Sequence, residues 1–287
     1  MSNTATVLAF DFGASSGRAI RAVYDGQNLT YEEIHRFENV PIEKDGHLCW
    51  DVETLLKEIH TAIQKAGTFD SLGFDTWGVD FGLLDADGHL LANPVHYRDA
   101  RTNGKPEQAA ACMPAEELYA HTGNQIMAIN TLFQLLALQE QEPELLQKAE
   151  QILFMPDLFA ALLGAEPVCE RSIASTSQML DPRTGQWSRE VLTAYGLKEN
   201  HFAPLVASGT VTGTLTTGAK IIAVAGHDTQ CASAAMPCAE EDVEHTAFLS
   251  CGTWSLLGTE LDTPILTADS CQSGPVSYTH LRAHETL

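Results

Sequence analysis

The sequence VLAFDFGASSGRAI at residues 7–20 decides the fold. An apolar run ends at the acidic residue Asp11, and a turn bounded by Gly13 and Gly17 contains two serines. This pattern predicts a strand, a tight turn and an antiparallel strand. Glycines let such a turn expose backbone N–H groups that cradle phosphate, and a carboxylate at its mouth can hold Mg²⁺ through water. The alternative is an ordinary hairpin, because turns rich in Gly and Ser are common.

The length and charge of the chain limit its function. Its 287 residues are enough for about two domains. The net charge of −22, from 38 acidic and 16 basic residues, argues against nucleic acid or an anionic membrane as a partner. A phosphate site is compatible with this charge, because screening over about 8 Å lets nearby N–H groups and cations dominate inside a cleft.

The cysteines and the first residues indicate a cellular compartment. The seven cysteines are scattered without a CxxC pair, which fits a reducing cytosol better than a disulfide framework or a zinc site. Residues 1–6 are polar and lack a basic start, so no signal peptide is predicted. No apolar run approaches about 18 residues, so no membrane span is predicted. We therefore expect a soluble, cytoplasmic protein.

Strand patterns open the chain and return after a helical middle. We expect strands over residues 7–10, 19–24, 29–37, 71–75, 211–215 and 221–225, and helices over residues 131–141, 156–163 and 188–195 and from residues 51 and 143. The Asp87-Gly88 pair predicts a hairpin turn between residues 81–85 and 90–91. The residue pattern changes from helical to strand-like near Gly209, and we therefore predict a domain boundary between residues 215 and 216.

A second hairpin pattern follows far downstream. The stretch AFLSCGTWSLLG at residues 247–258 again has an apolar strand, a glycine turn with a hydroxyl group, and an apolar strand. Two facing hairpins can grip a phosphate chain from both sides. Between the two patterns, Asp228 follows a predicted strand and precedes a predicted helix, which is a rigid place for a carboxylate. It can be a general base or a helix N-cap worth about 1 kcal/mol.

Other polar and aromatic residues allow two interpretations each. Trp77 can offer an aromatic face to a sugar ring or pack in the core. Asp80, Asp99 and Arg101 carry groups suited to sugar hydroxyls, although Asp99 and Arg101 can equally form an ion pair that secures a loop. The pair His280 and His284 has helical metal-ligand spacing without an evident third ligand.

Nine motifs occur in order and together resemble one family. They are DFGASSGR (11–18), IHRFEN (34–39), WDVETL (50–55), DTWGVDF (75–81), PVHYRDARTNG (94–104), NTLFQL (130–135), MPDLF (155–159), GHDT (226–229) and SCGTWSLLG (250–258). With these motifs the chain resembles the FGGY family of carbohydrate kinases, over about residues 5–270. The resemblance implies an α/β fold of the actin-like (ribonuclease H-like) two-domain type, with the second domain incomplete.

The resemblance also implies an activity. It is the Mg²⁺-assisted transfer of the γ-phosphoryl group of ATP to a sugar hydroxyl, and the sugar expected is L-rhamnulose at its 1-hydroxyl, giving L-rhamnulose 1-phosphate in L-rhamnose degradation. The alternatives are a kinase for another ketose or polyol such as fuculose, or an inactive sugar-binding fragment.

The family motifs assign roles to individual residues. Ala14, Ser15, Ser16, Gly17, Arg18 and Thr253 would contact the ATP phosphates, and Asp11 would bind Mg²⁺ and ATP. Gly78, His227, Asp228 and Thr229 would contact the sugar, with Asp228 as the catalytic base. For Arg18, pairing with a surface acid is the alternative.

The chain departs from the family pattern in its length and its last residues. Family members run to nearly twice this length. We expect an N-terminal kinase domain over residues 1–215, the start of a C-terminal kinase domain over residues 216–270, and a non-native tail over residues 271–287. A chain of this length is expected to be poorly soluble and to have little kinase activity, because its second domain would lack neighbouring strands.

Overall fold

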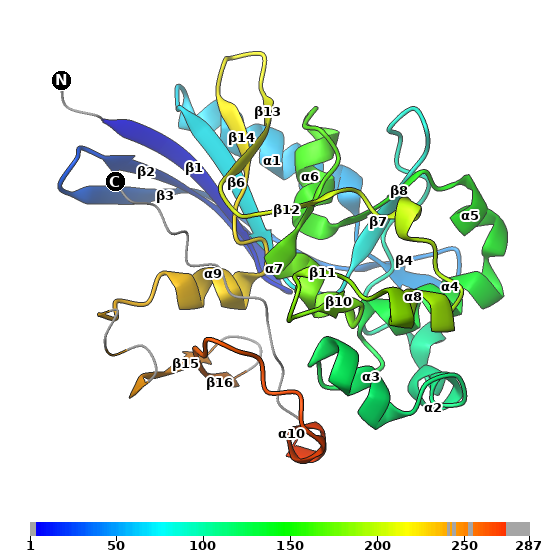
Figure 1. Cartoon of the computed structure of the whole chain (residues 1–287). Coiled ribbons are helices and arrows are strands. Elements are labelled where there is room, and N and C mark those ends of the chain that lie inside the picture. Colours follow the sequence, from blue (N-terminus) through cyan, green and yellow to red (C-terminus); the bar gives the residue numbers. More distant parts are fainter. Residues whose placement is uncertain (1–3, 240–241, 243–244, 252–254, 274–287) are drawn as a thin grey trace.

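A six-stranded mixed sheet forms the centre of the protein (Figure 1). The computed structural model describes residues 4–239, 242, 245–251 and 255–273. The strand order is β13-β14-β6-β1-β2-β3. The strands are β1 (Ala5–Phe12), β2 (Ser16–Tyr24), β3 (Leu29–Glu38), β6 (Ser71–Thr76), β13 (Thr210–Thr214) and β14 (Lys220–Ala223). β1 pairs antiparallel with β2 and parallel with β6, so the predicted strand-turn-strand is confirmed and β1 lies in the interior of the sheet.

Alternating side chains of β1 divide the core from the open face of the sheet. Leu8, Phe10 and Phe12 are fully buried, while Asp11 points to the opposite face and is partly exposed. Phe10 stacks on Phe74 of β6 at 4.8 Å between ring centroids. The alternation of side chains along β1 therefore buries the phenylalanines on one face of the sheet and leaves Asp11 accessible on the other.

Helices pack against the sheet and form a second region beside it. α1 (Val52–Ala66) begins after Asp51, whose side chain accepts the Thr54 N–H as predicted. α1 contacts β2 and β3, and α6 contacts β6 and β14. The remaining helices of the middle region are α2 (Lys105–Ala109), α3 (Ala115–Thr122), α4 (Thr131–Gln141), α5 (Pro143–Lys148), α6 (Met155–Leu162), α7 (Arg171–Ala174) and α8 (Arg189–Ala194). The helices predicted from residues 131, 143, 156 and 188 are thus confirmed.

Short elements connect these helices. Four small two-stranded pairs are β4 (Ile42–Lys44) with β5 (His47–Cys49), β7 (Phe81–Leu84) with β8 (Gln151–Phe154), β9 (Cys169–Glu170) with β12 (Leu205–Val206), and β10 (Leu180–Asp181) with β11 (Gln186–Trp187). Three 3-10 turns are η1 (Ala100–Thr102), η2 (Ser175–Ser177) and η3 (Glu199–His201). The predicted hairpin over residues 81–91 is confirmed: Leu84 bridges Leu90, and the Leu91 N–H donates to the Leu83 carbonyl at 2.9 Å, while β7 also pairs with β8.

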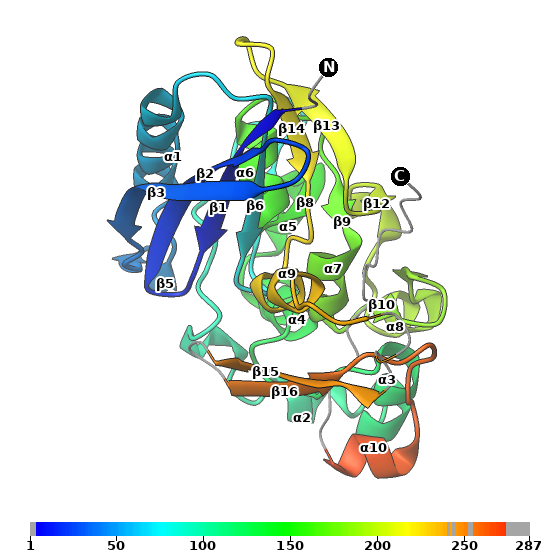
Figure 2. The same cartoon turned by 90° about the vertical axis from the view of Figure 1, so that its left-hand side faces the viewer.

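The last elements leave the central sheet. They are α9 (Asp228–Ala234), β15 (Ala247–Cys251), β16 (Ser255–Thr259) and α10 (Ala268–Ser273). β15 and β16 pair antiparallel, as the second hairpin pattern predicts, and form a separate two-stranded sheet below α9 (Figure 2). Of the predicted tail, residues 274–287 lie outside the described residues.

The predicted domain boundary does not agree with the strand pairing. It lies between residues 215 and 216, in the connection from β13 to β14, yet β14 pairs parallel with β6 inside the six-stranded sheet. A cut there would remove β14 from its neighbours. The division into domains remains a proposal, and a boundary after Ala223 fits the pairing better.

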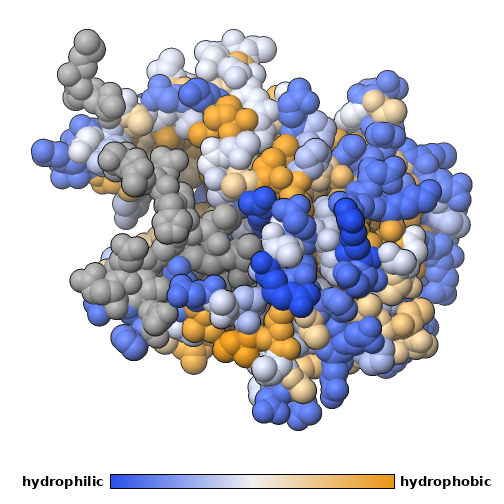
Figure 3. All heavy atoms as spheres, in the orientation of Figure 1, coloured by the Kyte–Doolittle hydropathy of each residue, from blue (hydrophilic) through white to orange (hydrophobic). Residues whose placement is uncertain are grey.

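The surface and the helix lengths agree with the composition. Hydrophilic side chains predominate on the face seen in Figure 3, and hydrophobic side chains gather in smaller groups in its upper middle and lower parts. None of the helices in the described part of the chain has the length and apolar character that a membrane span needs.

Candidate active site

A cleft of about 690 Å³ collects most of the predicted site residues. Its walls come from the β1–β2 hairpin, the loop after β6, the start of α9 and the β15–β16 pair. The predicted residues that line it are Asp11, Ala14, Ser15, Ser16, Arg18, Gly78, His227, Asp228 and Thr229. Thr253 lies outside the described residues. Residues from both hairpins and Asp228 therefore face one cavity.

The turn between β1 and β2 is held by its own backbone and by Asn39. The Gly13 N–H donates to the Ser16 carbonyl at 2.9 Å, and the Asn39 side-chain amide donates to the Gly13 carbonyl at 2.9 Å. The Asn39 N–H also donates to the Ser15 carbonyl at 3.1 Å. Asn39 is buried, so it fixes a turn whose other side opens into the cleft.

Gly17 has a packing role that sequence reasoning missed. It is buried and is not among the residues that line the cleft. A Cβ atom at this position would lie 2.2 Å from Cζ of Phe37, which is its cross-strand neighbour on β3. Only a glycine fits beneath this ring, whatever the turn binds.

Arg18 and Asp11 form an ion pair at the mouth of the turn. Nε and the terminal amino group of Arg18 lie 2.7 and 2.6 Å from Oδ2 of Asp11. The Arg18 side chain is 46% exposed and that of Asp11 30%, so the pair contributes about 0–1 kcal/mol. The structure thus shows an acid partner for Arg18, which is one of the two interpretations of this residue.

Asp75 adds a carboxylate that sequence reasoning did not single out. It stands opposite Asp11 in the parallel register of β1 and β6 and lines the same cleft. Burial raises the pKa of Asp75 well above its ordinary value, and the negative charges of Asp11 and Asp228 raise it further. The signal was available, because adjacent parallel strands end at the same sheet edge. The floor of the cleft therefore brings the carboxyl groups of Asp11, Asp75 and Asp228 close enough to influence one another, and the raised pKa favours the protonated form of Asp75.

The loop after β6 holds a strained backbone at the cleft. Val79 has a φ of 70°, an unfavourable value for a β-branched residue. Its N–H donates to Oγ1 of Thr176 at 3.0 Å, and its carbonyl accepts from Oγ1 of Thr131 at 2.6 Å. A Cβ at Gly78 would lie 3.0 Å from Cγ2 of Thr176. These contacts hold the Gly78 backbone in the wall of the cleft.

Asp80 anchors the aromatic side of this wall. It is fully buried, and its carboxylate accepts from Nε1 of Trp50 at 2.6 Å, Nε1 of Trp77 at 3.0 Å, the Tyr97 N–H at 3.2 Å and the Gln134 side-chain amide at 2.8 Å. Burial raises the pKa of Asp80 to about 6, against the opposing effect of these hydrogen bonds. The prediction that Asp80 binds sugar hydroxyls is wrong, because all four donors belong to the protein.

The aromatic rings beside Asp80 form a stack that reaches the cleft. The centroids of Trp77 and Trp50 are 4.0 Å apart, His96 stacks on Trp50 at 4.2 Å, and Tyr97 follows at 4.4 Å. Trp77 and Tyr97, at the two ends, line the cavity. Trp77 is 5% exposed, so it is a packed residue that also borders the cleft.

Asp99 has a local structural role. It accepts hydrogen bonds from the N–H groups of Leu48 and Arg101, at 2.8 and 2.9 Å. Asp99 and Arg101 are both absent from the lining of the cleft among the described residues. The loop-securing interpretation is therefore the better one, through backbone hydrogen bonds to the carboxylate of Asp99.

The segment 226–229 brings Asp228 to the cleft. The Thr76 N–H donates to the Gly226 carbonyl at 2.9 Å, which ties this segment to the end of β6. His227 is the N-cap residue of α9, so the interpretation of Asp228 as the N-cap is wrong. The Asp228 side chain is 37% exposed, and its Oδ1 accepts the Thr229 N–H at 2.6 Å. Burial lowers the pKa of His227, which favours the neutral imidazole.

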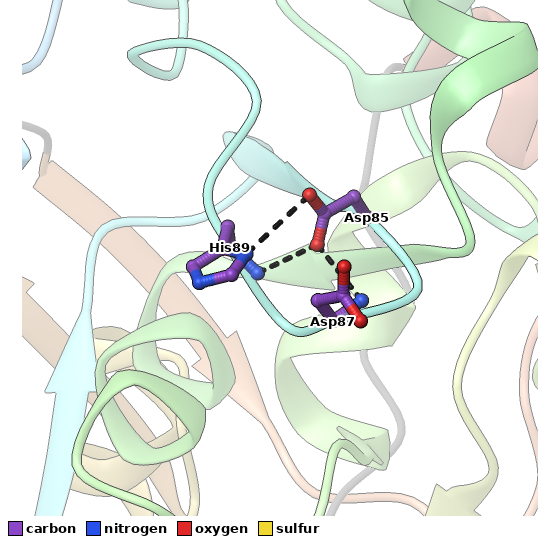
Figure 4. Close-up of side chains that lie close together, drawn as sticks. All are labelled: Asp85, Asp87 and His89. Carbon is purple, nitrogen blue, oxygen red and sulfur yellow. Dashed lines mark hydrogen bonds and ion pairs between the residues drawn. The ribbon is translucent and has the colours of Figure 1, made fainter.

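One group of metal-ligand type lies elsewhere in the described ranges. Asp85, Asp87 and His89 place their ligand atoms within 4.8 Å of one another (Figure 4). They form the turn after β7, where Oδ1 of Asp85 accepts the N–H groups of Asp87 and His89. These hydrogen bonds explain the grouping as turn geometry. The pair His280 and His284 lies outside the described residues.

Comparison with known proteins identifies the relatives of this chain. The model of the FGGY family of carbohydrate kinases, N-terminal domain, matches residues 6–234. The rhamnulokinase of Bacteroides thetaiotaomicron is 41% identical over 276 residues, and that of Enterococcus faecalis is 39% identical over 282 residues. These alignments cover 92% and 93% of this chain and 56% of each relative, so the chain spans about half the length of the curated relatives it matches.

Solved structures share the fold. The ligand-bound xylulose kinase from Lactobacillus acidophilus superposes with a TM-score of 0.76 at 17% identity, covering 92% of this chain and 56% of that one. A structure of the corresponding kinase from Brucella ovis gives a TM-score of 0.74 at 22% identity, covering 89% and 54%. The predicted actin-like α/β fold is thereby confirmed.

Proposed function

The chain belongs to the FGGY family of carbohydrate kinases, and we propose that it phosphorylates L-rhamnulose at the 1-hydroxyl with ATP as the phosphoryl donor. The observation that carries the proposal is the single cleft that contains both the β1–β2 turn and Asp228. Identity of 38–41% to curated rhamnulokinases supports the choice of sugar. Because the chain covers 56–58% of these relatives, the activity is proposed for the whole protein.

We assign the two sides of the cleft to the two substrates. The turn residues Ala14, Ser15 and Ser16 supply backbone and hydroxyl groups to the ATP phosphates, with Arg18 beside them and Thr253 from the second hairpin. Gly78, His227 and Thr229 contact the sugar from the other side. The reaction is placed in the cytoplasm, in keeping with seven free thiols.

Asp228 is the proposed base. Its carboxylate orients the 1-hydroxyl of the sugar and accepts the proton as this oxygen bonds to the γ-phosphorus, and the bond from phosphorus to the ADP oxygen breaks. A carboxylate is a weak base at neutral pH, which suffices because phosphoryl transfer passes through a loose transition state. Its position at the start of α9 keeps the carboxylate fixed during the reaction.

The chemistry of the cleft fits a magnesium ion. Asp11, Asp75 and Asp228 all line the cavity, and carboxylate oxygens are preferred ligands of Mg²⁺. The mutual effect of these acids on the pKa of Asp75 shows a concentration of negative charge that a divalent cation would offset. Asp11 is the residue we assign to it, through water. When bound, the ion offsets charge on the transferred phosphoryl group.

The substitution Asp228→Asn tests the function in a protein of the relatives' full length. ATP- and L-rhamnulose-dependent ADP release should fall by at least about 100-fold, because the variant cannot accept the hydroxyl proton. The thermal midpoint should stay near that of the wild type. Asp87→Asn, in the exposed turn after β7, is the matched control and should leave turnover unchanged.

Two results would contradict the proposal. Retained turnover in Asp228→Asn would remove this residue from the mechanism. A wild-type protein that releases ADP with fuculose or another ketose, and not with L-rhamnulose, would replace the substrate.

A further inference from the structure

A second buried carboxylate, Glu170, lies behind the segment that carries Asp228. Glu170 is 1% exposed and is the N-cap residue of α7. Its Oε2 accepts from the N–H of Ser172 at 2.9 Å, Oγ of Ser172 at 2.5 Å, the N–H of Ile173 at 3.2 Å and the N–H of Gly226 at 3.1 Å. Its Oε1 accepts from Oγ of Ser208 at 2.6 Å. These five neutral donors satisfy a carboxylate that is removed from water.

Two of these contacts lead to the residues just before Asp228. Glu170 holds the Gly226 N–H directly, and Oγ of Ser172 accepts the N–H of His227 at 3.3 Å while it donates to Glu170. On the other side of Asp228, the side-chain amide of Gln230 donates to the Ser172 carbonyl at 2.9 Å. Residues at the start of α7 therefore form hydrogen bonds with the chain both before and after Asp228.

Packing leaves this segment little freedom to move. A Cβ at Gly226 would lie 2.9 Å from Cγ of Pro156 and 3.4 Å from Cβ of Ile173. Asp228 itself accepts hydrogen bonds from Thr229, its Oδ1 lies 3.5 Å from Nε2 of His227, and its carboxylate borders the cleft. The backbone is thus fixed from behind, and the reactive group faces the substrate side.

We propose that Glu170 and Ser172 are positioning residues that aim the carboxylate of Asp228 at the sugar hydroxyl. This inference rests on the proposed role of Asp228 as the base. Glu170 fixes the N–H group of Gly226, and Ser172 fixes that of His227. Displacement of a reacting group by about 1 Å can cost about 100-fold in rate, so a loosened segment should slow the chemical step.

Ser208 provides a matched control within the same cluster. It donates to Oε1 of Glu170, as Ser172 donates to Oε2, but within the described part of the chain its side chain makes no hydrogen bond to segment 226–228. Ser172 is fully buried and also accepts the His227 N–H, so a purely structural role of the cluster would make the two variants differ in thermal midpoint and not in kcat. A positioning role makes the folded variants differ in kcat.

The experiment compares Ser172→Ala and Ser208→Ala in the full-length protein. We expect Ser172→Ala to lower kcat about tenfold or more, with KM for ATP and for L-rhamnulose within about twofold of the wild type. Ser208→Ala should keep kcat within about twofold, and the thermal midpoint should fall more in Ser172→Ala, because this variant also removes the acceptor of the His227 N–H. Equal kcat values in the two folded variants would overturn the inference.

Variants of Glu170 keep the test decisive if Ser172→Ala does not fold. In Glu170→Gln the amide nitrogen can face Ser208 and donate to its hydroxyl while the carbonyl keeps the other four donors, so kcat should stay within about threefold. Glu170→Asp is one methylene shorter and withdraws the carboxylate from Gly226, so kcat should fall about tenfold. Folded Glu170→Asp with wild-type kcat would refute the positioning role.

The controls separate this inference from the proposed function. A wild-type protein without L-rhamnulose kinase activity contradicts the function itself. A wild-type protein that is active and is inactivated by Asp228→Asn, with no difference between the serine variants, contradicts the positioning role alone.

Discussion

Two hairpins border the cleft, and their sequences are similar while their surroundings differ. The β1–β2 hairpin lies inside a six-stranded sheet, with neighbours on both sides and with Phe10 and Phe12 fully buried. The β15–β16 hairpin forms a sheet of two strands, and its directly opposed Leu249 and Leu257 are 62% and 76% exposed. An apolar strand, a glycine turn and a second apolar strand therefore specify a hairpin, whereas its burial depends on the strands and helices beside it.

The same contrast separates the two walls of the cleft. The wall built from residues before position 230 contains the buried polar centres at Asp80 and Glu170, each with several hydrogen-bond donors. The wall that β15 and β16 contribute consists of half-buried side chains such as Ser250 and Leu256. The first wall should thus respond strongly to single substitutions and the second weakly.

The largest expected effect concerns the pH dependence of the first wall. Asp80 has an ordinary pKa of 3.8 in the unfolded chain and about 6 in the folded protein, because burial outweighs its hydrogen bonds. Between pH 4 and 6 the carboxyl of Asp80 is protonated in the folded protein and ionised in the unfolded chain. Its contribution to the free energy of unfolding is therefore complete below pH 4 and is lost as the pH rises to 6. A difference of about 2 in pKa corresponds to about 3 kcal/mol.

Urea unfolding of the wild type and of Asp80→Asn, from pH 4 to pH 7, measures this effect. The free energy of unfolding of the wild type should fall relative to the variant by up to about 3 kcal/mol between pH 4 and 6. Arg101 and Tyr97 keep their protonation over this range. Burial lowers the pKa of His96, in the stack beside Asp80, to about 4, and because His96 is present in both proteins its contribution cancels in the comparison. Parallel pH curves for the two proteins would show that the carboxyl of Asp80 titrates as in water.

One glycine in the second strand of each hairpin gives the next effect, because each lies against a phenylalanine ring of a paired strand. An added Cβ would lie 2.2 Å from the ring of Phe37 at Gly17 and 2.4 Å from the ring of Phe248 at Gly258. Phe37 is buried and packs edge-on against Phe12 at 5.2 Å, so its ring has no room to move. Gly17→Ala should therefore destabilise the chain by about 1–3 kcal/mol.

Gly258→Ala is the matched comparison. Phe248 is only half-buried, so its ring can turn towards solvent, and the free energy of unfolding should change by less than about 0.5 kcal/mol. Denaturant titration of both variants measures the difference. Equal losses in the two variants would mean that the second hairpin is packed as tightly as the first.

The sequence predicted local features of the site better than its long-range contacts. The apolar run at residues 7–10 and the glycine turn after it are sufficient to predict strand β1, and the motifs bring Asp11, Gly78 and Asp228 into one hypothesis. The donors to Asp80 come from positions 50, 77, 97 and 134, and no local pattern indicates which strands and helices bring them together. The packing role of Gly17 is missed for the same reason: Phe37, the ring it contacts, lies on another strand, so the sequence indicates only a phosphate contact.

The smallest effect is expected on the exposed face of the second hairpin. Leu257 is 76% exposed, so Leu257→Lys removes little buried apolar area and adds a charge to water. The free energy of unfolding of the chain should change by less than about 0.5 kcal/mol, and its solubility should rise because an exposed apolar pair is interrupted. Chemical denaturation and the concentration at which the protein precipitates measure the two outcomes. A loss of more than about 1 kcal/mol would show that Leu257 is covered in solution, and the contrast between the two hairpins would then disappear.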